Sequence, residues 1–179
     1  MREDKQYTYA DYCTWDDGQR WELIDGVPYA MAGLSDAHQS IVGELHGQLW
    51  TFLKDNPCKV FTAPFDVRLS EDTVVQPDLL VICDQSKRDG KGIVGAPDMV
   101  IEISSPATSR HDKIEKLQKY QEAGAREYWI VDPDDRTVLA FVFEPGHQSI
   151  KSYFDDAAAP VYVLEGCVIN LAAVFAEQN

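Results

Sequence analysis

The chain has few cysteines, and their arrangement suggests neither a disulfide framework nor a structural zinc site. They are scattered, with no CxxC pair and no histidine at zinc-like spacing. We therefore expect all four to be reduced and structural. Cys83 closes an apolar run and is expected to pack as a small buried hydrophobe. The four positions are Cys13, Cys58, Cys83 and Cys167.

Long apolar runs are also absent. No stretch approaches the roughly 18 uninterrupted apolar residues that a membrane span needs. The first five residues are polar and do not resemble a secretory signal peptide. The sequence therefore excludes a membrane-spanning protein and predicts a protein of the cytoplasm.

Positive charge is scarce. The chain has 16 Lys and Arg against 30 Asp and Glu, for a formal net charge of −14. Proteins that bind nucleic acid usually carry a basic surface that displaces counterions from phosphates, so tight non-specific DNA binding is disfavoured. Bound divalent cations would cancel part of this charge locally. One small basic cluster is present, at Arg110, Lys113, Lys116 and Lys119.

The length and composition are those of one globular domain. With 179 residues, 45% hydrophobic and 26% charged, the chain can bury a substantial core. It shows no internal repeat, low-complexity tract or linker. We expect a single domain over residues 1–179. Residues 1–19 would form an N-terminal arm with one short helix, and residues 145–179 a peripheral extension with a small strand and a short final helix.

The pattern between these ends predicts a mixed α/β (α+β) fold. Asp25-Gly26 is typical of a tight turn between strands near 20–25 and 27–32. A helix begins at Ser35 or Asp36 and ends at Asn56-Pro57. The remaining predictions are strands at 58–69 and 74–83 in a central sheet, a surface loop at 84–95, a strand at 97–105, a helix from 109 to 124, and strands at 126–132 and 137–144. This order predicts a mixed sheet flanked by helices.

Two carboxylates lie within strongly apolar strand segments, where an ionised side chain is unfavourable. Asp78 shares its strand face with Leu80 and Ile82, and Glu102 lies between Ile101 and Ile103. An ionised carboxylate is costly to bury unless a cation, a metal or several hydrogen bonds compensate. Magnesium takes one or two protein carboxylates and completes its shell with water and substrate phosphate, so the pair suggests a phosphodiester-cleaving site.

A structural interpretation of the two carboxylates remains open, and a serine-hydrolase site in the same segment is excluded. Asp78 and Glu102 could instead form buried ion pairs with Arg68 or a lysine. A serine-hydrolase site at Ser104 and Ser105 is excluded because no GxSxG elbow surrounds them and a proline follows directly.

Pro77-Asp78, followed about two dozen residues later by Glu102-Ile103-Ser104, resembles the PD-(D/E)XK nuclease motif, although position 104 is serine where the motif has lysine. The wider segments ELIDG at 22–26, QPDLLVIC at 76–83 and GAPDMVIEISSPATSRHDKIEKLQKYQEAGAREYWIVDP at 95–133 resemble the Uma-two family of restriction-endonuclease-like proteins. The similarity runs from about residue 20 to residue 133 and is weaker beyond.

The resemblance implies a restriction-endonuclease-like core and hydrolysis of DNA phosphodiesters with Mg²⁺ or Mn²⁺. It implies metal binding by Asp78 and Glu102. In that family the motif's lysine is displaced to the following helix, which implies a catalytic role for Lys116. From the residues alone, Lys113 and Lys116 cannot be distinguished, because both lie at the border of the helix's apolar stripe and both could be solvated charges.

Two further positions match the family. Glu22 on the first hairpin is a candidate metal ligand or water-orienting base, or else the partner of Arg20 or a lysine in a salt bridge. His38, just inside the first long helix, is a candidate catalytic group, or else a helix-terminal histidine without such a role.

The sequence thus favours a metal-dependent nuclease acting on DNA, and a homodimer if both strands of a duplex are cut. The main alternative is a non-catalytic interaction or nucleic-acid-sensing module on the same fold, which the acidic charge and the displaced lysine favour. A nuclease acting on RNA or on a small phosphodiester is a third possibility, and a small substrate is easier to reconcile with the acidity.

Overall fold

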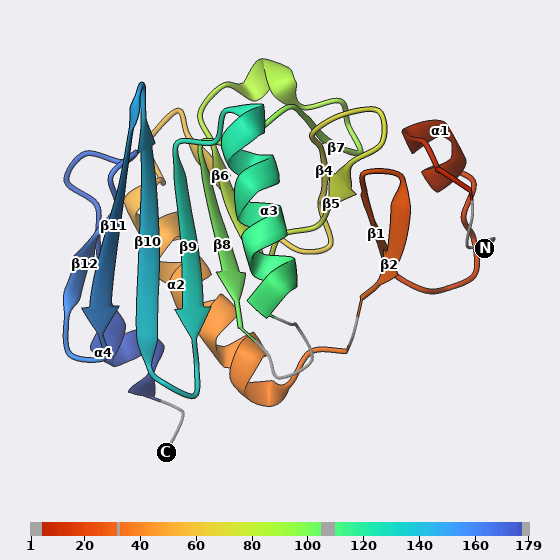
Figure 1. Ribbon diagram of the computed structural model, residues 1–179. Coiled ribbons are helices and arrows are strands. Elements are labelled where there is room, and N and C mark those ends of the chain that lie inside the picture. The colour runs from red at the N-terminus through yellow and green to blue at the C-terminus, as the bar shows by residue number, and fades with distance from the viewer. Residues whose placement is uncertain (1–4, 32, 105–109, 177–179) are drawn as a thin grey trace.

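The computed structural model describes residues 5–31, 33–104 and 110–176, and of residues 110–113 the backbone only. It confirms the predicted mixed α/β class (Figure 1). The larger sheet has six strands in the order β11-β10-β9-β8-β6-β3 and the smaller has five in the order β2-β1-β5-β4-β7. The elements of the larger sheet are β3 (Lys59–Thr62), β6 (Leu79–Ile82), β8 (Met99–Ile103), β9 (Glu127–Asp132), β10 (Thr137–Glu144) and β11 (His147–Phe154).

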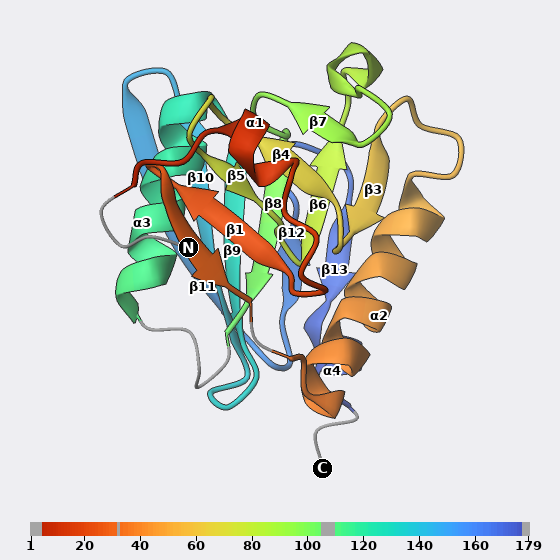
Figure 2. The same ribbon diagram turned by 90° about the vertical axis from the view of Figure 1, so that its right-hand side faces the viewer.

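The smaller sheet lies beside the larger one and carries the N-terminal arm, whose helix α1 (Tyr9–Tyr12) rests over it (Figure 2). Its strands are β1 (Trp21–Ile24), β2 (Val27–Ala30), β4 (Asp66–Arg68), β5 (Val74–Val75) and β7 (Gly92–Val94). The other elements are α2 (Asp36–Phe52), the 3₁₀ turn η1 (Gln85–Lys87), α3 (Arg110–Ala123), the pair β12 (Ala158–Pro160) and β13 (Val168–Asn170), and α4 (Leu171–Val174).

Side chains alternate across the larger sheet, and each face builds a separate core. Leu79, Val81 and Ile101 pack with α2 on one face. Leu80 and Val100 point to the other face, where Tyr120 of α3 joins the second core. Such alternation follows from the two-residue period of a strand. The two long helices therefore cover opposite faces of the sheet (Figure 1).

The predicted strands at 58–69 and 74–83 are each divided between the two sheets, so placing both wholly in one central sheet was wrong. The chain leaves the larger sheet after β3, forms β4 and β5 in the smaller sheet, and returns as β6. Proline interrupts both segments, at Pro64 and Pro77, and proline cannot donate to a strand ladder. The residues 76–78 therefore bridge the two sheets.

Local turn and capping signals agree with the structure. Asp25 and Gly26 adopt φ of 48° and 75° in the β1–β2 turn. The Ser35 side chain accepts a hydrogen bond from the backbone N of His38 and caps α2. Gly124 follows α3 with φ of 97°. Two details differ: α2 ends at Phe52 rather than near residue 56, and the predicted loop at 84–95 contains η1 and β7.

The C-terminal segment is more deeply built into the protein than the expected peripheral extension. Strand β11 forms a long antiparallel hairpin with β10. Beyond it, Ile169, Leu171 and Phe175 are fully buried in the same core as α2. The segment therefore closes the α2 side of the larger sheet.

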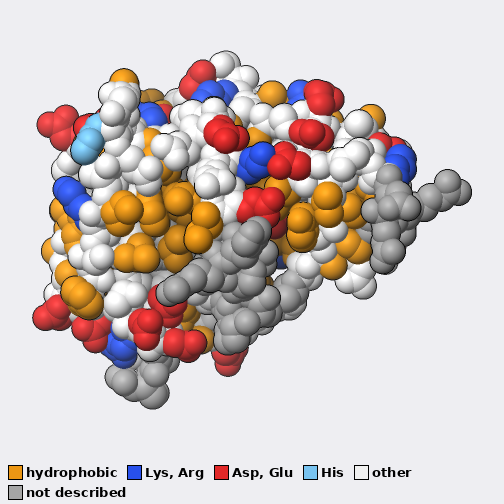
Figure 3. All heavy atoms as spheres, viewed as in Figure 1, with side chains coloured by type: hydrophobic (Ala, Val, Ile, Leu, Met, Phe, Trp, Pro, Cys, Tyr) orange, Lys and Arg blue, Asp and Glu red, His pale blue; other side chains and the backbone are white. Residues whose placement is uncertain are grey.

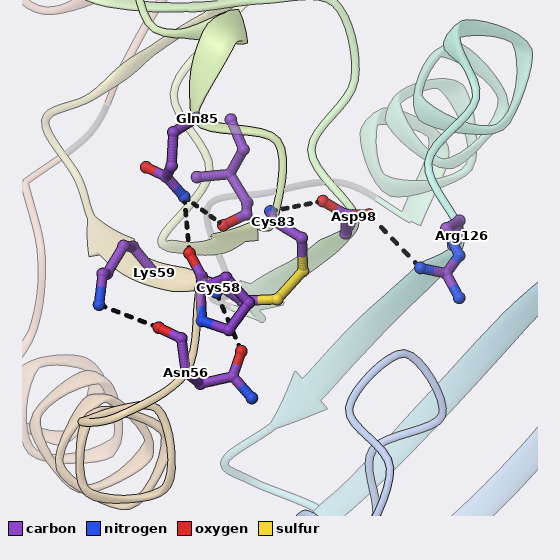
Figure 4. The surroundings of a disulfide bond; sticks show 9 residues. Asn56, Cys58, Lys59, Cys83, Gln85, Asp98 and Arg126 are labelled. Carbon is purple, nitrogen blue, oxygen red and sulfur yellow. Dashed lines mark hydrogen bonds and ion pairs between the residues drawn. A yellow bond between two sulfur atoms is a disulfide. The ribbon is translucent and has the colours of Figure 1, made fainter.

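The expectation of four reduced cysteines was wrong for two of them, because Cys58 and Cys83 form a disulfide (Figure 4). Lys59 pairs with Ile82 in the β3–β6 ladder, so Cys58 and Cys83 are the next residues opposite one another. Cys13 and Cys167 are free. The physical reason is the strand register, which the spacing of cysteines along the chain does not reveal.

None of the described helices is long and apolar enough to cross a membrane.

Candidate active site

Five polar side chains from five segments meet where the two sheets adjoin. Asp78 directly precedes β6, and the β6–β8 register, in which Leu79 pairs with Ile101, places it opposite Glu102. Directly opposed residues of an antiparallel pair have Cβ atoms about 5 Å apart. Glu22 comes from β1 of the smaller sheet, and Lys116 and His38 come from α3 and α2. The candidate residues predicted from the sequence therefore lie together.

Lys116 joins two carboxylates that belong to different sheets. Its Nζ lies 2.8 Å from Oε1 of Glu22 and 3.1 Å from Oε1 of Glu102. Glu22 is 6% exposed, and its Oε1 also accepts a hydrogen bond of 2.8 Å from the backbone N of Gln76. The lysine is thus fixed by two charge-assisted contacts in a nearly closed environment.

Asp78 is held on its other side by α2. Its Oδ2 lies 3.0 Å from Nε2 of His38 and accepts a hydrogen bond of 2.8 Å from the backbone N of Ile103. Both side chains are buried. Nδ1 of His38 is buried and has no hydrogen-bond partner in the described part of the chain. His38 therefore presents its Nε2 side to Asp78 and positions that carboxylate.

The cluster contains three carboxyl groups and one lysine in a buried environment, and the pKa values of Glu102 and Lys116 are both raised. Burial raises the pKa of Glu102 to about 8; Lys116 opposes this shift, and the charges of Asp78 and Glu22 add to it. Burial by itself would lower the pKa of Lys116, but Glu102 and Glu22 outweigh it and hold that pKa above its usual range. The neighbouring carboxylates therefore favour the protonated form of Lys116.

Two buried tyrosines lie beside the carboxylates and were not singled out from the sequence as site residues. Tyr120 of α3 and Tyr128 of β9 pack with ring centroids 5.6 Å apart. Burial, with the nearby carboxylates, raises the pKa of both hydroxyls well above the usual range. Neither hydroxyl has a partner among the described residues. The two aromatic rings therefore pack beside the charged groups and keep water from them.

Gln76 was also missed. Its backbone amide fixes Glu22 across the junction of the two sheets. A backbone contact of this kind carries no side-chain signal in the sequence.

The carboxylates fit a hard divalent cation. The contacts described above all fall on one oxygen of each carboxylate, namely Oδ2 of Asp78 and Oε1 of Glu22 and Glu102. Within the described part of the chain, these contacts leave the second oxygen of each carboxylate for another ligand. Within the described ranges no three acidic, histidine or cysteine side chains converge as a ready-made cage.

The other ion pairs considered from the sequence have different outcomes. Lys119 pairs with Asp25 at 2.8 Å. Arg68 contacts Glu71 and not the site carboxylates. Glu22 and Glu102 both pair with a lysine, as one interpretation expected, and that lysine is Lys116. The side chain of Lys113 and the whole of Ser105 lie outside the described residues.

Comparison with known proteins identifies the family of this chain. A family model described as "Putative restriction endonuclease", named Uma2, matches residues 8–172. The chain belongs to the Uma2 family. The match covers almost all of the described chain, including every residue of the site.

Two individual proteins resemble this Uma2 chain. An uncharacterized protein of Synechocystis is 28% identical over 113 residues, which are 62% of this chain and 60% of that protein, so the match spans less than two thirds of the relative. A crystal structure titled as a putative nuclease belonging to DUF820, from Anabaena variabilis, has a TM-score of 0.80 and 19% identity over 96% of this chain and 99% of that one. This second likeness shows a shared fold.

Proposed function

We propose that this Uma2 protein is a metal-dependent nuclease that hydrolyses phosphodiester bonds of DNA. The observation that carries the proposal is the convergence of Asp78, Glu102, Glu22 and Lys116 at the junction of the two sheets. Membership of a family described as restriction endonucleases supports it.

In this proposal Asp78 and Glu102 would hold Mg²⁺ or Mn²⁺. When bound, such an ion polarises the phosphoryl oxygen and lowers the pKa of a coordinated water. The protein's own groups orient the phosphate and the nucleophile around it.

Lys116 would stabilise the negative charge that develops on the scissile phosphate. Its two carboxylate partners favour the protonated form, in which it donates hydrogen bonds. Removing one such donor typically slows a reaction by about 100-fold to 1,000-fold.

Glu22 and His38 would have supporting roles. Glu22 keeps Lys116 in place, and we assign it the further role of binding the metal or orienting the attacking water. His38 holds the Asp78 carboxylate through Nε2, so that the metal-binding oxygen keeps one orientation.

The test is cleavage of single-stranded and double-stranded DNA and of RNA, with Mg²⁺ or Mn²⁺, by the wild type and by Glu102→Gln and Lys116→Met. Lys119→Met is the matched control, because Lys119 lies on the same helix and, among the described residues, forms its ion pairs with Asp25 and Glu122. Circular dichroism verifies that each variant is folded. We expect metal-dependent DNA cleavage that falls by at least about 100-fold in the two site variants and persists in the control.

Other results would change the conclusion. Cleavage confined to RNA would mean that the same site belongs to a ribonuclease. Absence of cleavage by folded wild-type protein on every substrate would indicate the interaction module, which the net charge of −14 favours.

We also propose that the protein acts as a homodimer, since cutting both strands of a duplex requires two sites. An exposed apolar surface on β10 and β11 supports this. Ile150 and Phe154 on the edge strand are 59% and 61% exposed, and Leu139 lies on the same face (Figure 3). Contiguous apolar surface of this kind is typical of protein interfaces.

A further inference from the structure

A cavity of about 290 Å³ lies between the N-terminal arm and the outer face of the smaller sheet. Its walls carry four aromatic rings, from Tyr9, Tyr12, Trp15 and Trp21. Two cations, Arg20 and Lys91, complete one side. The volume is at the lower end for small-molecule sites and is much too small for a double helix.

The aromatic rings form a continuous but half-exposed wall. The rings of Tyr12 and Trp15 have centroids 5.3 Å apart, and those of Trp15 and Trp21 are 6.0 Å apart. None of the four side chains is fully buried, so each leaves part of its surface towards solvent or the cavity. Such rings offer stacking surface to a planar heterocycle.

The polar groups of the cavity are already fixed in position. Arg20 donates through Nε and Nη2 to Oε1 of Gln76, at 3.0 and 2.8 Å. Gln76 donates through Nε2 to the Tyr12 hydroxyl and to Asp66, and that hydroxyl also donates to Asp66. The negative charge of Asp66 is therefore hydrogen-bonded within the wall.

The positive charges of the cavity have no acidic partner. Within the described ranges, neither Arg20 nor Lys91 forms an ion pair. In a chain with 30 acidic residues and 16 basic ones, two cations without an acidic partner at one aromatic-lined cavity leave positive charge for an anionic ligand. They suit an anion attached to a planar ring.

The cavity is coupled to the acidic site through two short segments. Trp21, which lines the cavity, directly precedes Glu22, and the two-residue period of a strand places the Glu22 side chain on the opposite face of β1. Gln76 contributes its side chain to the cavity and its backbone amide to Glu22. A ligand in the cavity would therefore lie across β1 from the Glu22 side chain.

We propose that this cavity binds one unpaired nucleotide of the nucleic-acid substrate, with its base stacked on the aromatic wall and its phosphate against Arg20 and Lys91. The inference rests on the proposed nuclease function. A base inside a duplex cannot reach such a wall, so the cavity selects single-stranded nucleic acid or a nucleotide displaced from a duplex.

The test measures binding of fluorescein-labelled dT₈ by anisotropy in EDTA, where no metal-dependent cleavage occurs. Trp15→Ala and Lys91→Gln should each weaken binding, by about tenfold for the lost stacking ring. Trp15→Tyr keeps a ring and should largely restore it. Trp50→Ala is the matched control, since Trp50 is 55% exposed on α2, away from the cavity. Competition by dTMP, thymidine and inorganic phosphate separates the contributions of base and phosphate.

The outcomes separate this inference from the proposed function. Wild-type affinity in folded Trp15→Ala and in Lys91→Gln would overturn it. Lys91 is exposed and unpaired, so Lys91→Gln decides the question even if Trp15→Ala fails to fold. Binding that depends on these residues without any cleavage would leave the pocket standing while the nuclease proposal fails. Nucleic-acid cleavage that is unaffected by both variants would support the nuclease proposal and contradict the nucleotide pocket.

Discussion

Lys116 is the side chain on which the arrangement of the candidate site depends, because it contacts carboxylates from both sheets. Glu22 and Glu102 would otherwise repel one another in a region that excludes water. Cleavage measurements on folded Lys116→Met test whether this lysine also serves as the catalytic cation.

Asp78 provides a residue-scale test of metal binding that does not depend on catalysis. A ligand that binds only the folded state stabilises it by about 2.7 kcal/mol at 100 times its dissociation constant. We expect Mn²⁺ to raise the melting temperature of the wild type but not that of Asp78→Asn. Asp84→Asn, just beyond the opposite end of β6, should respond like the wild type. Equal stabilisation of all three proteins would exclude Asp78 as a ligand.

Glu127 is a buried carboxylate outside the candidate site. It is fully buried, and its oxygens accept hydrogen bonds from Nε1 of Trp129, at 2.7 Å, and from the backbone N of Val163, at 2.9 Å. Burial raises its pKa, although these hydrogen bonds oppose the shift. Through Val163 it ties β9 to the C-terminal segment.

The raised pKa of Glu127 has a defined effect on the pH dependence of stability. A group whose pKa is higher in the folded state contributes its full stability below its unfolded pKa and loses it as the pH rises through the folded pKa. As the pH rises above 4.5, the ordinary pKa of a glutamate side chain, the wild type should therefore lose stability relative to Glu127→Gln. Urea unfolding of both proteins from pH 4 to pH 8 measures the difference. Parallel curves would contradict the prediction, whatever their offset.

At the scale of elements, the disulfide fastens the junction of β3 and β6 at the end remote from Asp78 (Figure 4). The hydrogen bond from the backbone N of Cys83 to Asp98 and the ion pair of Asp98 with Arg126 extend this junction to β9. The strand pairing is thus supported at both ends, by the covalent link on one side and by the contacts of Asp78 on the other.

The disulfide should make a measurable contribution to stability. Closing a loop of 25 residues is worth about 3 kcal/mol in the chain-entropy model. We expect the Cys58→Ser, Cys83→Ser double variant to lose roughly this free energy of unfolding, and dithiothreitol to reduce the melting temperature of the wild type. Cys13→Ser, at an exposed free cysteine, serves as the control. Four reactive thiols in the unreduced, unfolded wild type would show that the bond does not form.

At the scale of the whole molecule, the exposed face of β10 and β11 and the net charge act in opposite directions. The apolar side chains of Ile150 and Phe154 favour association, whereas a charge of −14 on each copy opposes it. Salt should therefore strengthen the dimer, because it screens the repulsion between the two charged copies and leaves the burial of apolar surface intact.

Light scattering after size exclusion provides the whole-molecule test. We expect a dimer at 0.15 M salt or above, and a monomer for the Ile150→Asp, Phe154→Asp double variant under the same conditions. Trp50→Asp, which changes an exposed aromatic residue on α2, should leave the dimer intact. A wild type that stays monomeric at every protein and salt concentration would refute the homodimer.

The elements that could be predicted from the sequence are those encoded by short-range chemistry. The β1–β2 turn follows from Asp25-Gly26, the start of α2 from Ser35, and the end of α3 from Gly124. The buried strands β8 and β9 follow from apolar residues within a few positions of one another. Asp78 and Glu102 stand out for the same reason, since a carboxylate in an apolar strand is visible locally.

The tertiary structure decided the features that depend on how distant segments meet. The pairing of Cys58 with Cys83 depends on the β3–β6 register, and the division of residues 58–83 between two sheets depends on where each strand finds partners. The contact of Lys116 with both Glu22 and Glu102 requires α3 to lie over the junction of those sheets. The sequence alone determined which residues are apolar, charged or turn-forming. Only long-range packing, which no local pattern encodes, determined which of them share a site.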